Sequence, residues 1–286
     1  NCSFFINRSY LPAEVLLEIT ERLQTEDVVI LWCCGSTLLN HKLSKNGGVR
    51  TFNFVFKGPR SKSWPALLNQ WRGLESIKLN SLMNTYVPVK KEHLLELPPT
   101  VTNLAFLLDD PFFKTLLSAL KEGTQRFEGL KRLELNGYEG SLVKLVPHLP
   151  KGLESLDYWL DCSEAREIRD SSALNLLPPG LTSLTISTFS IDSICNGGLP
   201  PSLTYLLAIV RESLVDWIPF LPPNLLFCHV ESNYDTSETE VLTLTALPKT
   251  LHSLCLRFKP EFELSREIIE SLPPNLTTLE ISAPIL

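Results

Sequence analysis

The sequence predicts an α/β solenoid in which one short strand recurs ten times, joined by segments that are partly helical and partly irregular. Leucine supplies 55 of the 286 residues, which indicates that one leucine pattern is used many times. The frame Leu-x-x-Leu-x-Leu returns every 22 to 29 residues, and its fourth and sixth positions are apolar in every copy. A recurrence of this length is typical of proteins whose units stack on one another.

The first position of each copy is an aliphatic anchor. The ten anchors are Val49, Leu74, Val101, Leu130, Leu153, Leu181, Leu203, Leu225, Leu251 and Leu276. Their spacing lies in the range of leucine-rich repeats, roughly 20–29 residues. We therefore expect a leucine-rich-repeat solenoid over residues 47–286, with a curved parallel sheet as its inner layer.

Positions 4 and 6 of the frame test this assignment, because alternate residues of a strand point to the same face. If these positions face the core, they must be apolar in every copy. All twenty residues are apolar or aromatic, from Phe52 and Phe54 in the first copy to Leu279 and Ile281 in the last. We expect them to form the core.

Proline stands three residues before the anchor in seven copies. Because proline has no N–H and a fixed φ, it cannot lie inside a central strand, but it can set the turn that leads into one. Each strand is therefore expected to be short and to start at a rigid corner. The prolines are Pro98, Pro150, Pro178, Pro200, Pro222, Pro248 and Pro273.

The segments between the strands differ from one another. Residues 92–97, 112–120 and 266–272 have the apolar spacing of helices, whereas residues 188–198 are short and glycine-rich. At position 9, where leucine-rich repeats usually carry asparagine or cysteine, Asn233 alone fits, so the usual asparagine ladder is not expected. The recurring Leu-Pro-Pro-x-Leu sequence is similar to the FNIP-type repeats of slime moulds and some fungi and protists.

Residues 1–46 precede the repeats and lack their period. Leu11-Pro12-Ala13-Glu14 is expected to open a helix, with proline in its first turn and an acidic side chain near its positive end. Two more short helices are expected after Thr25 and Ser36. Three short helices cannot bury an adequate core alone. This segment resembles an F-box, on Leu11, Pro12, Glu14, Val15, Leu16, Ile19, Leu23, Asp27 and Val28.

The whole chain is thus similar to an F-box/leucine-rich-repeat protein of fungal type. The resemblance implies a substrate-recognition subunit of a Skp-cullin-F-box ubiquitin ligase, not itself an enzyme, in the cytoplasm, the nucleus or both. The F-box would dock on the Skp-type adaptor of the cullin complex, and the repeats would hold an unknown protein substrate. The adaptor-binding residues would be Leu11, Pro12, Val15, Leu16, Ile19 and Leu23. The alternative is a non-enzymatic interaction scaffold outside ubiquitination.

Composition and charge disfavour several other classes of protein. The 26 basic and 32 acidic residues give a net charge of −6, whereas a general nucleic-acid binder carries a basic surplus. No apolar run is long enough to span a membrane. The seven cysteines show no Cys-x-x-Cys spacing, which favours reduced thiols over a disulfide framework or a zinc site. We expect no nucleic-acid partner, no membrane and no cofactor.

No catalytic motif is present in the sequence. None of the five histidines lies in a His-Glu-x-x-His motif, and neither a Gly-x-Ser-x-Gly elbow nor a phosphate-binding loop occurs. Asp109 with Asp110 could hold a metal ion, and Cys33 with Cys34 could be redox active. A solvated loop and helix packing, respectively, are the favoured interpretations of these two pairs.

Positions 3, 5 and 7 of each strand are expected to point out of the core, onto the concave face of the sheet. Most of them are small or polar. Large apolar side chains there suggest a partner-binding site, unless a loop or helix covers them or the frame is misplaced. The predicted substrate-binding residues are Trp159, Tyr205, Leu207, Phe227 and His229, and Ile209 is expected to face the same way. A partner with mixed or basic charge is favoured by the charged neighbours Glu134, Asp157, Glu231, Arg257 and Lys259.

Overall fold

The structure, a computed structural model, describes ten stretches of the chain. They are residues 51–56, 74–81, 89–108, 110–137, 142–160, 174–189, 198–210, 218–232, 246–257 and 269–282. The chain divides into two compact units, Asn1–Leu130 and Lys131–Leu286. The predicted F-box-like module, residues 1–46, and its boundary with the repeats lie outside the described residues.

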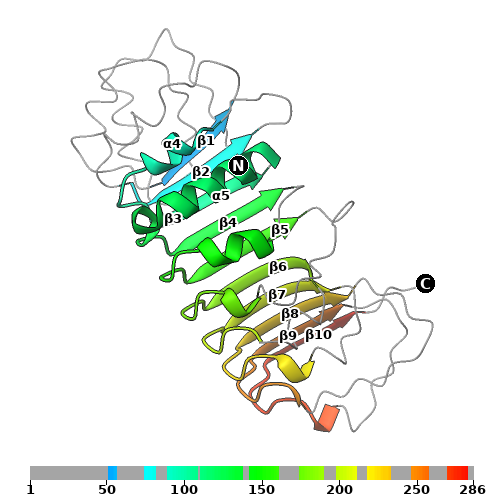
Figure 1. Ribbon diagram of the computed structural model, residues 1–286. Helices are drawn as coiled ribbons and strands as arrows, with labels where there is room; N and C mark the ends of the chain where they lie inside the picture. The colour runs from blue at the N-terminus through cyan, green and yellow to red at the C-terminus, as the bar shows by residue number, and fades with distance from the viewer. Residues whose placement is uncertain are drawn as a thin grey trace, which may run out of the picture. The chain divides into compact units, whose positions relative to one another are not determined.

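Ten strands of five to seven residues run through the described residues. The first unit holds β1 (Thr51–Phe56), β2 (Ser76–Ser81) and β3 (Asn103–Leu108). The second unit holds β4 (Arg132–Gly137), β5 (Ser155–Leu160), β6 (Ser183–Phe189), β7 (Tyr205–Val210), β8 (Phe227–Ser232), β9 (Ser253–Arg257) and β10 (Thr278–Ser282). Within each unit every strand pairs in parallel with the next strand of the chain (Figure 1). The predicted parallel sheet is confirmed in both units.

The register of the strands reproduces the repeat frame. Leu156 lies opposite Leu184, and Leu184 lies opposite Leu206, so position 4 of one copy meets position 4 of the next. A shift of one residue would have turned each strand's apolar set towards the other face. The anchors assigned from the sequence are therefore the anchors of the fold in the described residues, which leave out Val49.

The inward rows form the core of the repeats. Burial raises the pKa of the Tyr158 hydroxyl well above its usual range, so this group stays protonated. In strands β3 to β9 all residues at positions 4 and 6 are buried: Leu104, Phe106, Leu133, Leu135, Leu156, Tyr158, Leu184, Ile186, Leu206, Ala208, Cys228, Val230, Leu254 and Leu256.

The last strand departs from the predicted core. Leu279 on β10 is 39% exposed and Ile281 is half-buried, although both occupy inward positions. β10 pairs with β9, and no further strand follows it in the described part of the chain. An inward side chain needs neighbouring rows on both sides to be fully covered, so the core assignment of these two residues is wrong.

The prolines form the predicted corners. In all seven copies the carbonyl oxygen of the proline accepts a hydrogen bond from the anchor N–H three residues later, at 3.0–3.2 Å. The bond closes a tight turn, and the proline's missing N–H is not needed there. The anchors that donate are Val101, Leu153, Leu181, Leu203, Leu225, Leu251 and Leu276.

A ladder of side-chain hydrogen bonds joins the corners of neighbouring repeats. Ser202 Oγ donates to the carbonyl oxygens of Pro179 and Leu181 at 2.8 and 2.6 Å, and Thr250 Oγ1 donates to the corresponding carbonyls of Pro223 and Leu225 at 2.8 Å each. The other donors at this position, directly before the anchor, are Thr100, Asn224 and Asn275. These side chains link adjacent repeats, although the asparagine ladder usual at position 9 is missing.

Replacing Gly180 with serine is expected to stabilise the second unit. Gly180 occupies the ladder position in a Leu-Pro-Pro-Gly-Leu corner, lacks a positive φ, and has no atom within 4 Å of an added Cβ. A serine there can donate to the carbonyls of Lys151 and Leu153, which correspond to the acceptors of Ser202. One such bond contributes about 0.5–1.5 kcal/mol. The control is Gly180→Ala, which changes chain entropy alone. Equal thermal midpoints of the two variants would contradict a role for the ladder.

Two of the three predicted helices are present in the first unit. They are α4 (Lys91–Leu95) and α5 (Asp110–Glu122), which is followed by a short turn, η1 (Thr124–Phe127). Lys91 Nζ lies 2.8 Å from Glu122 Oε2 and joins the two helices. A Cβ on Gly123, directly after α5, would lie 2.9 Å from the backbone oxygen of Ala119 and would also meet the end of the Leu95 side chain, so the close packing favours glycine here.

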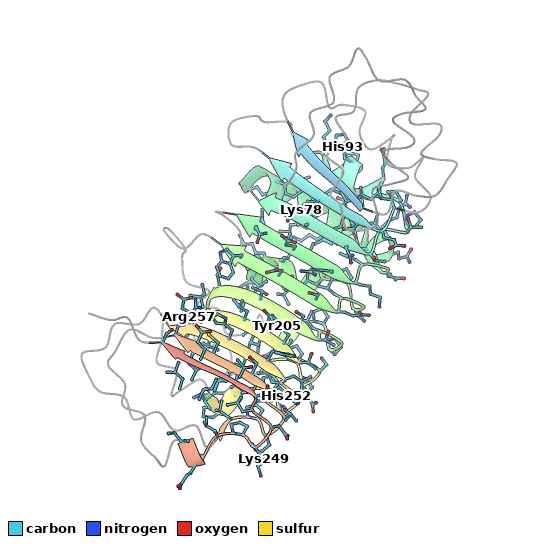
Figure 2. All side chains as sticks on the ribbon, turned by 180° about the vertical axis from the view of Figure 1, so that it is seen from behind. Lys78, His93, Tyr205, Lys249, His252 and Arg257 are labelled. Atoms are coloured by element: carbon cyan, nitrogen blue, oxygen red, sulfur yellow. The ribbon has the colours of Figure 1, made fainter. Side chains whose placement is uncertain are left out.

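The described helices of the second unit are shorter than α5. They include α6 (Leu142–Leu145) and the single turns η2 (Val146–His148), η3 (Leu174–Leu176) and η4 (Ile218–Phe220). In each unit the helices lie on one side of the strands, as the opposite views of Figures 1 and 2 show. The other side therefore carries positions 3, 5 and 7. Of the third predicted helix, residues 266–272, the structure describes residues 269–272, and Ile269 and Glu270 are helical. Most of the predicted irregular segment, residues 188–198, lies outside the described residues.

Candidate functional site

The candidate site lies on the side of β4–β10 that carries positions 3, 5 and 7, which we call the repeat face. Neighbouring strands are about 4.8 Å apart, and alternate residues of one strand are about 6.6 Å apart, so these positions form a regular grid of side chains. The register places each predicted residue on this grid. Figure 2 labels Tyr205 on β7 and Arg257 at the end of β9.

Four of the five predicted substrate-binding residues form one block. Tyr205 and Leu207 on β7 lie opposite Phe227 and His229 on β8. The Tyr205 and Phe227 rings are tilted by 40° with centroids 6.4 Å apart, and the two side chains are 38% and 47% exposed. We call these four residues the apolar block. Two neighbouring exposed aromatic rings can cover a partner side chain with little loss of side-chain entropy.

His229 gives the apolar block a neutral polar edge. Burial, followed by the positive charge of Arg257, lowers the pKa of this imidazole from its usual value, so it is neutral at pH 7. Next to it on β9 lies Cys255, a half-buried free thiol. Burial and then the Glu280 carboxylate raise the pKa of Cys255, so this thiol stays protonated and is not an activated nucleophile.

Ile209 corrects one sequence prediction. It occupies position 7 of β7, which is an outward position, yet it is 9% exposed. Its register partner on β6, Ser187, is fully buried. The register shifts between Ser187 and Phe189, so the pleat of β6 is irregular at this end. Strict alternation of faces holds only for a regular strand, and Ile209 is therefore not part of the exposed face.

Trp159 is separate from the apolar block. It is 38% exposed at position 7 of β5, opposite Asn136 on β4. Two strand spacings and four residues along the strand separate it from Tyr205, a distance of about 16 Å. Between them β6 presents Ser183 and Thr185, which are small and half-buried. The structure thus divides the predicted five-residue patch into two parts.

Two carboxylates accompany Trp159. Glu134 on β4 and Asp157 on β5 are register partners at position 5, so they lie side by side on the repeat face. Asn136 Nδ2 donates to Glu134 Oε1 at 2.8 Å and orients that carboxylate. The sequence analysis placed the two acidic residues next to the site but did not include Asn136. Its place at position 7 of the repeat indicates that Asn136 faces the same way.

The far end of the repeat face carries an ion pair. Arg257 on β9 and Glu280 on β10 form an ion pair at 3.1 Å, and both side chains are about half exposed. Glu231 lies opposite Arg257 in the β8–β9 register. An exposed pair of this kind contributes little to stability, and Glu231 beside it leaves one excess negative charge at this end of the face.

The remaining site predictions have fewer structural data. The six predicted adaptor-binding residues, Leu11 to Leu23, and Lys259 lie outside the described residues.

Within the described stretches, no cluster of three or more His, Cys, Asp or Glu side chains could hold a metal ion. The helices in those stretches are too short or too polar to cross a bilayer. Burial, and then Cys255, raise the pKa of the Cys228 thiol to about 12.

Comparison with known proteins gives a likeness at the level of fold. The chain resembles the structure titled as a crystal structure of a TLR13–ssRNA13 complex, with a TM-score of 0.52 and 18% identity over 85% of this chain and 34% of that one. The chain has a leucine-rich-repeat fold. It also matches CroV588, titled a novel circular LRR protein, with a TM-score of 0.38 and 17% identity over 74% of this chain and 30% of that one. No protein family model and no curated protein matches the chain.

The leucine-rich-repeat chain spans about a third of the length of each of these two structures. At such identities the likeness shows the fold, and the RNA named in one title belongs to that complex. The expectation that the present chain binds no nucleic acid stays a prediction from its net charge of −6.

Proposed function

We propose that the chain is the substrate-recognition subunit of a Skp-cullin-F-box ubiquitin ligase. The observation that supports this role is the apolar block, an exposed pair of aromatic rings on a leucine-rich-repeat sheet that directly follows an F-box-like sequence. Such a receptor performs no chemistry. It holds the target protein close to the ubiquitin-transfer machinery, which raises the effective concentration of the target's lysines.

The adaptor would bind the F-box-like segment. Its apolar stripe is formed by Leu11, Pro12, Val15, Leu16, Ile19 and Leu23. These are more apolar side chains than a module of three short helices buries by itself, and an adaptor surface would cover the excess. The proposed location is the cytoplasm, the nucleus or both, which agrees with free thiols at Cys228 and Cys255.

The target protein would bind the repeat face, at Trp159, Tyr205, Leu207, Phe227 and His229. Burial of one large side chain on binding contributes about 1.5–3 kcal/mol. Two or three such anchors can therefore supply most of a micromolar affinity before the costs of association are subtracted. The two exposed aromatic rings of the apolar block can act as such anchors without any rearrangement of the core.

Replacing Tyr205 and Phe227 with alanine is expected to release the target and to leave adaptor binding unchanged. Two lost anchors correspond to a weakening of about 100-fold or more. The measurement is quantitative mass spectrometry of proteins that co-purify with the full chain. Phe220→Ala is the matched control, because Phe220 is 39% exposed on the η4 turn, away from the repeat face. If the double variant keeps every partner other than the adaptor, the target binds elsewhere.

The second candidate function is an interaction scaffold outside ubiquitination. The apolar block supports this role equally well, because a repeat face binds its partner in the same way in both. The discriminating experiment is a pull-down of a purified Skp-type adaptor with the full chain. A stable complex supports the ligase subunit, whereas partners bound through the repeat face without any adaptor support the scaffold.

A further inference from the structure

We propose that the repeat face recognises an extended peptide segment that carries one large apolar side chain and, three or four residues away, an arginine or lysine. The inference rests on the proposed role of the repeat face in binding a protein partner. It adds the chemistry of that partner, which follows from the division of the face into the apolar block and a second, acidic subsite.

The acidic subsite consists of Glu134, Asp157 and Trp159, and Arg132 lies two residues before Glu134 on the same face of β4. The two carboxylates are register partners on β4 and β5, and Trp159 stands two residues after Asp157 on the same face. Carboxylates attract a cation, and an exposed indole ring binds the face of a guanidinium or ammonium group by a cation–π contact. A basic side chain is therefore the group that satisfies both features at once.

The charge of the surrounding face agrees with this assignment. Positions 3, 5 and 7 of β4–β10 carry four carboxylates, on Glu134, Asp157, Glu231 and Glu280, against two guanidinium groups, on Arg132 and Arg257. Arg257 is paired with Glu280, and His229 is neutral. The face is acidic overall, and a basic partner segment complements it.

The strand between the two subsites favours an extended segment. β6 presents Ser183 and Thr185, whose small side chains let a peptide backbone approach the sheet and whose hydroxyls can hydrogen-bond to it. Asp157 on β5 is two strand spacings from Leu207 on β7 and three from His229 on β8, or about 10–14 Å. An extended peptide rises about 3.3 Å per residue, so three or four residues bridge this distance.

A selection from a random library of displayed linear 12-residue peptides tests the inference directly. The full chain is immobilised, and each enriched peptide is synthesised and its dissociation constant is measured by fluorescence anisotropy. The expected result is enrichment of peptides with a large apolar residue and an arginine or lysine three or four positions away. Their binding is expected to weaken as ionic strength rises, because exposed charge pairs are screened.

Two variants separate the subsites. Glu134→Gln with Asp157→Asn is expected to weaken binding of the enriched peptides about tenfold and to abolish its salt dependence, because the charges of two half-buried carboxylates are lost. Phe227→Ser is expected to remove binding altogether. The matched control is Glu96→Gln with Glu128→Gln, which removes two exposed negative charges that are not part of the repeat face and should leave affinity unchanged.

The outcomes distinguish the inference from the proposed function. Peptides that need Phe227 but show no basic residue would overturn the basic partner and leave the repeat face as a binding surface. Peptides that bind equally to the Phe227→Ser variant, or a selection without any binder, would overturn both the linear peptide and the proposed use of this face. If basic peptides are enriched but bind equally well after Glu134 and Asp157 are replaced, their cation binds elsewhere, and the acidic subsite is contradicted.

Discussion

Leu206→Ala is expected to lower the free energy of unfolding of the second unit by about 2–5 kcal/mol. Leu206 is fully buried at position 4 of β7, between Leu184 on β6 and Cys228 on β8. Truncation removes its transfer free energy and leaves a cavity that neighbouring rows on both sides hold open. Urea unfolding followed by circular dichroism measures the loss.

Leu207→Ala is the matched control for this prediction. Leu207 is the next residue of the same strand, but it faces outward and is half-buried. The same chemical change there should cost less than about 1 kcal/mol, because its side chain is already in contact with water. Equal losses at the two positions would mean that the inward and outward assignments are displaced by one residue.

The double change Leu16→Asp and Ile19→Asp is expected to abolish binding of a Skp-type adaptor. Both residues lie on the predicted apolar stripe, and burying two carboxylates against an apolar surface without partners costs several kcal/mol. The repeats should keep their fold, because the stripe belongs to a separate segment of the chain. Size-exclusion chromatography with the purified adaptor measures complex formation, and circular dichroism checks the fold.

A control variant tests whether the position of the added charges matters, or only their number. In the helix predicted from the sequence, with about 100° per residue, Ala13 and Gln24 would lie away from the stripe, so Ala13→Asp with Gln24→Asp adds the same charge there. This variant should still bind the adaptor. Adaptor binding by a folded Leu16→Asp, Ile19→Asp chain would refute the F-box assignment and favour the scaffold role.

The strands of this protein could be predicted because their signal is local and repeated. A strand has a period of two, so a single inward-facing set of apolar residues identifies its face wherever it recurs. The corner prolines act within four residues, and each does so through one bond to the following anchor. Stacking identical frames then determines the register without further information, as the pairing of Leu156, Leu184 and Leu206 shows.

Other features depend on what lies next to a residue in space. Leu279 has an inward position but no covering strand in the described residues, and Ile209 has an outward position but is buried where the pleat of β6 is irregular. The corner ladder that joins Ser202 to Pro179 and Leu181 spans neighbouring units, so no local pattern predicts it.

The arrangement of the candidate site was decided in the same way. The residues predicted to form one patch lie on a grid of side chains. The distance between two of them depends both on how many strands separate them and on their positions within those strands. Trp159 therefore stands beside Glu134 and Asp157, while Tyr205 meets Phe227. Side-chain chemistry and, where the strands are regular, facing direction were determined by the sequence alone. Distances between side chains on different strands were decided by the tertiary structure, because the stacking of parallel strands converts a separation of 22 residues into about 4.8 Å.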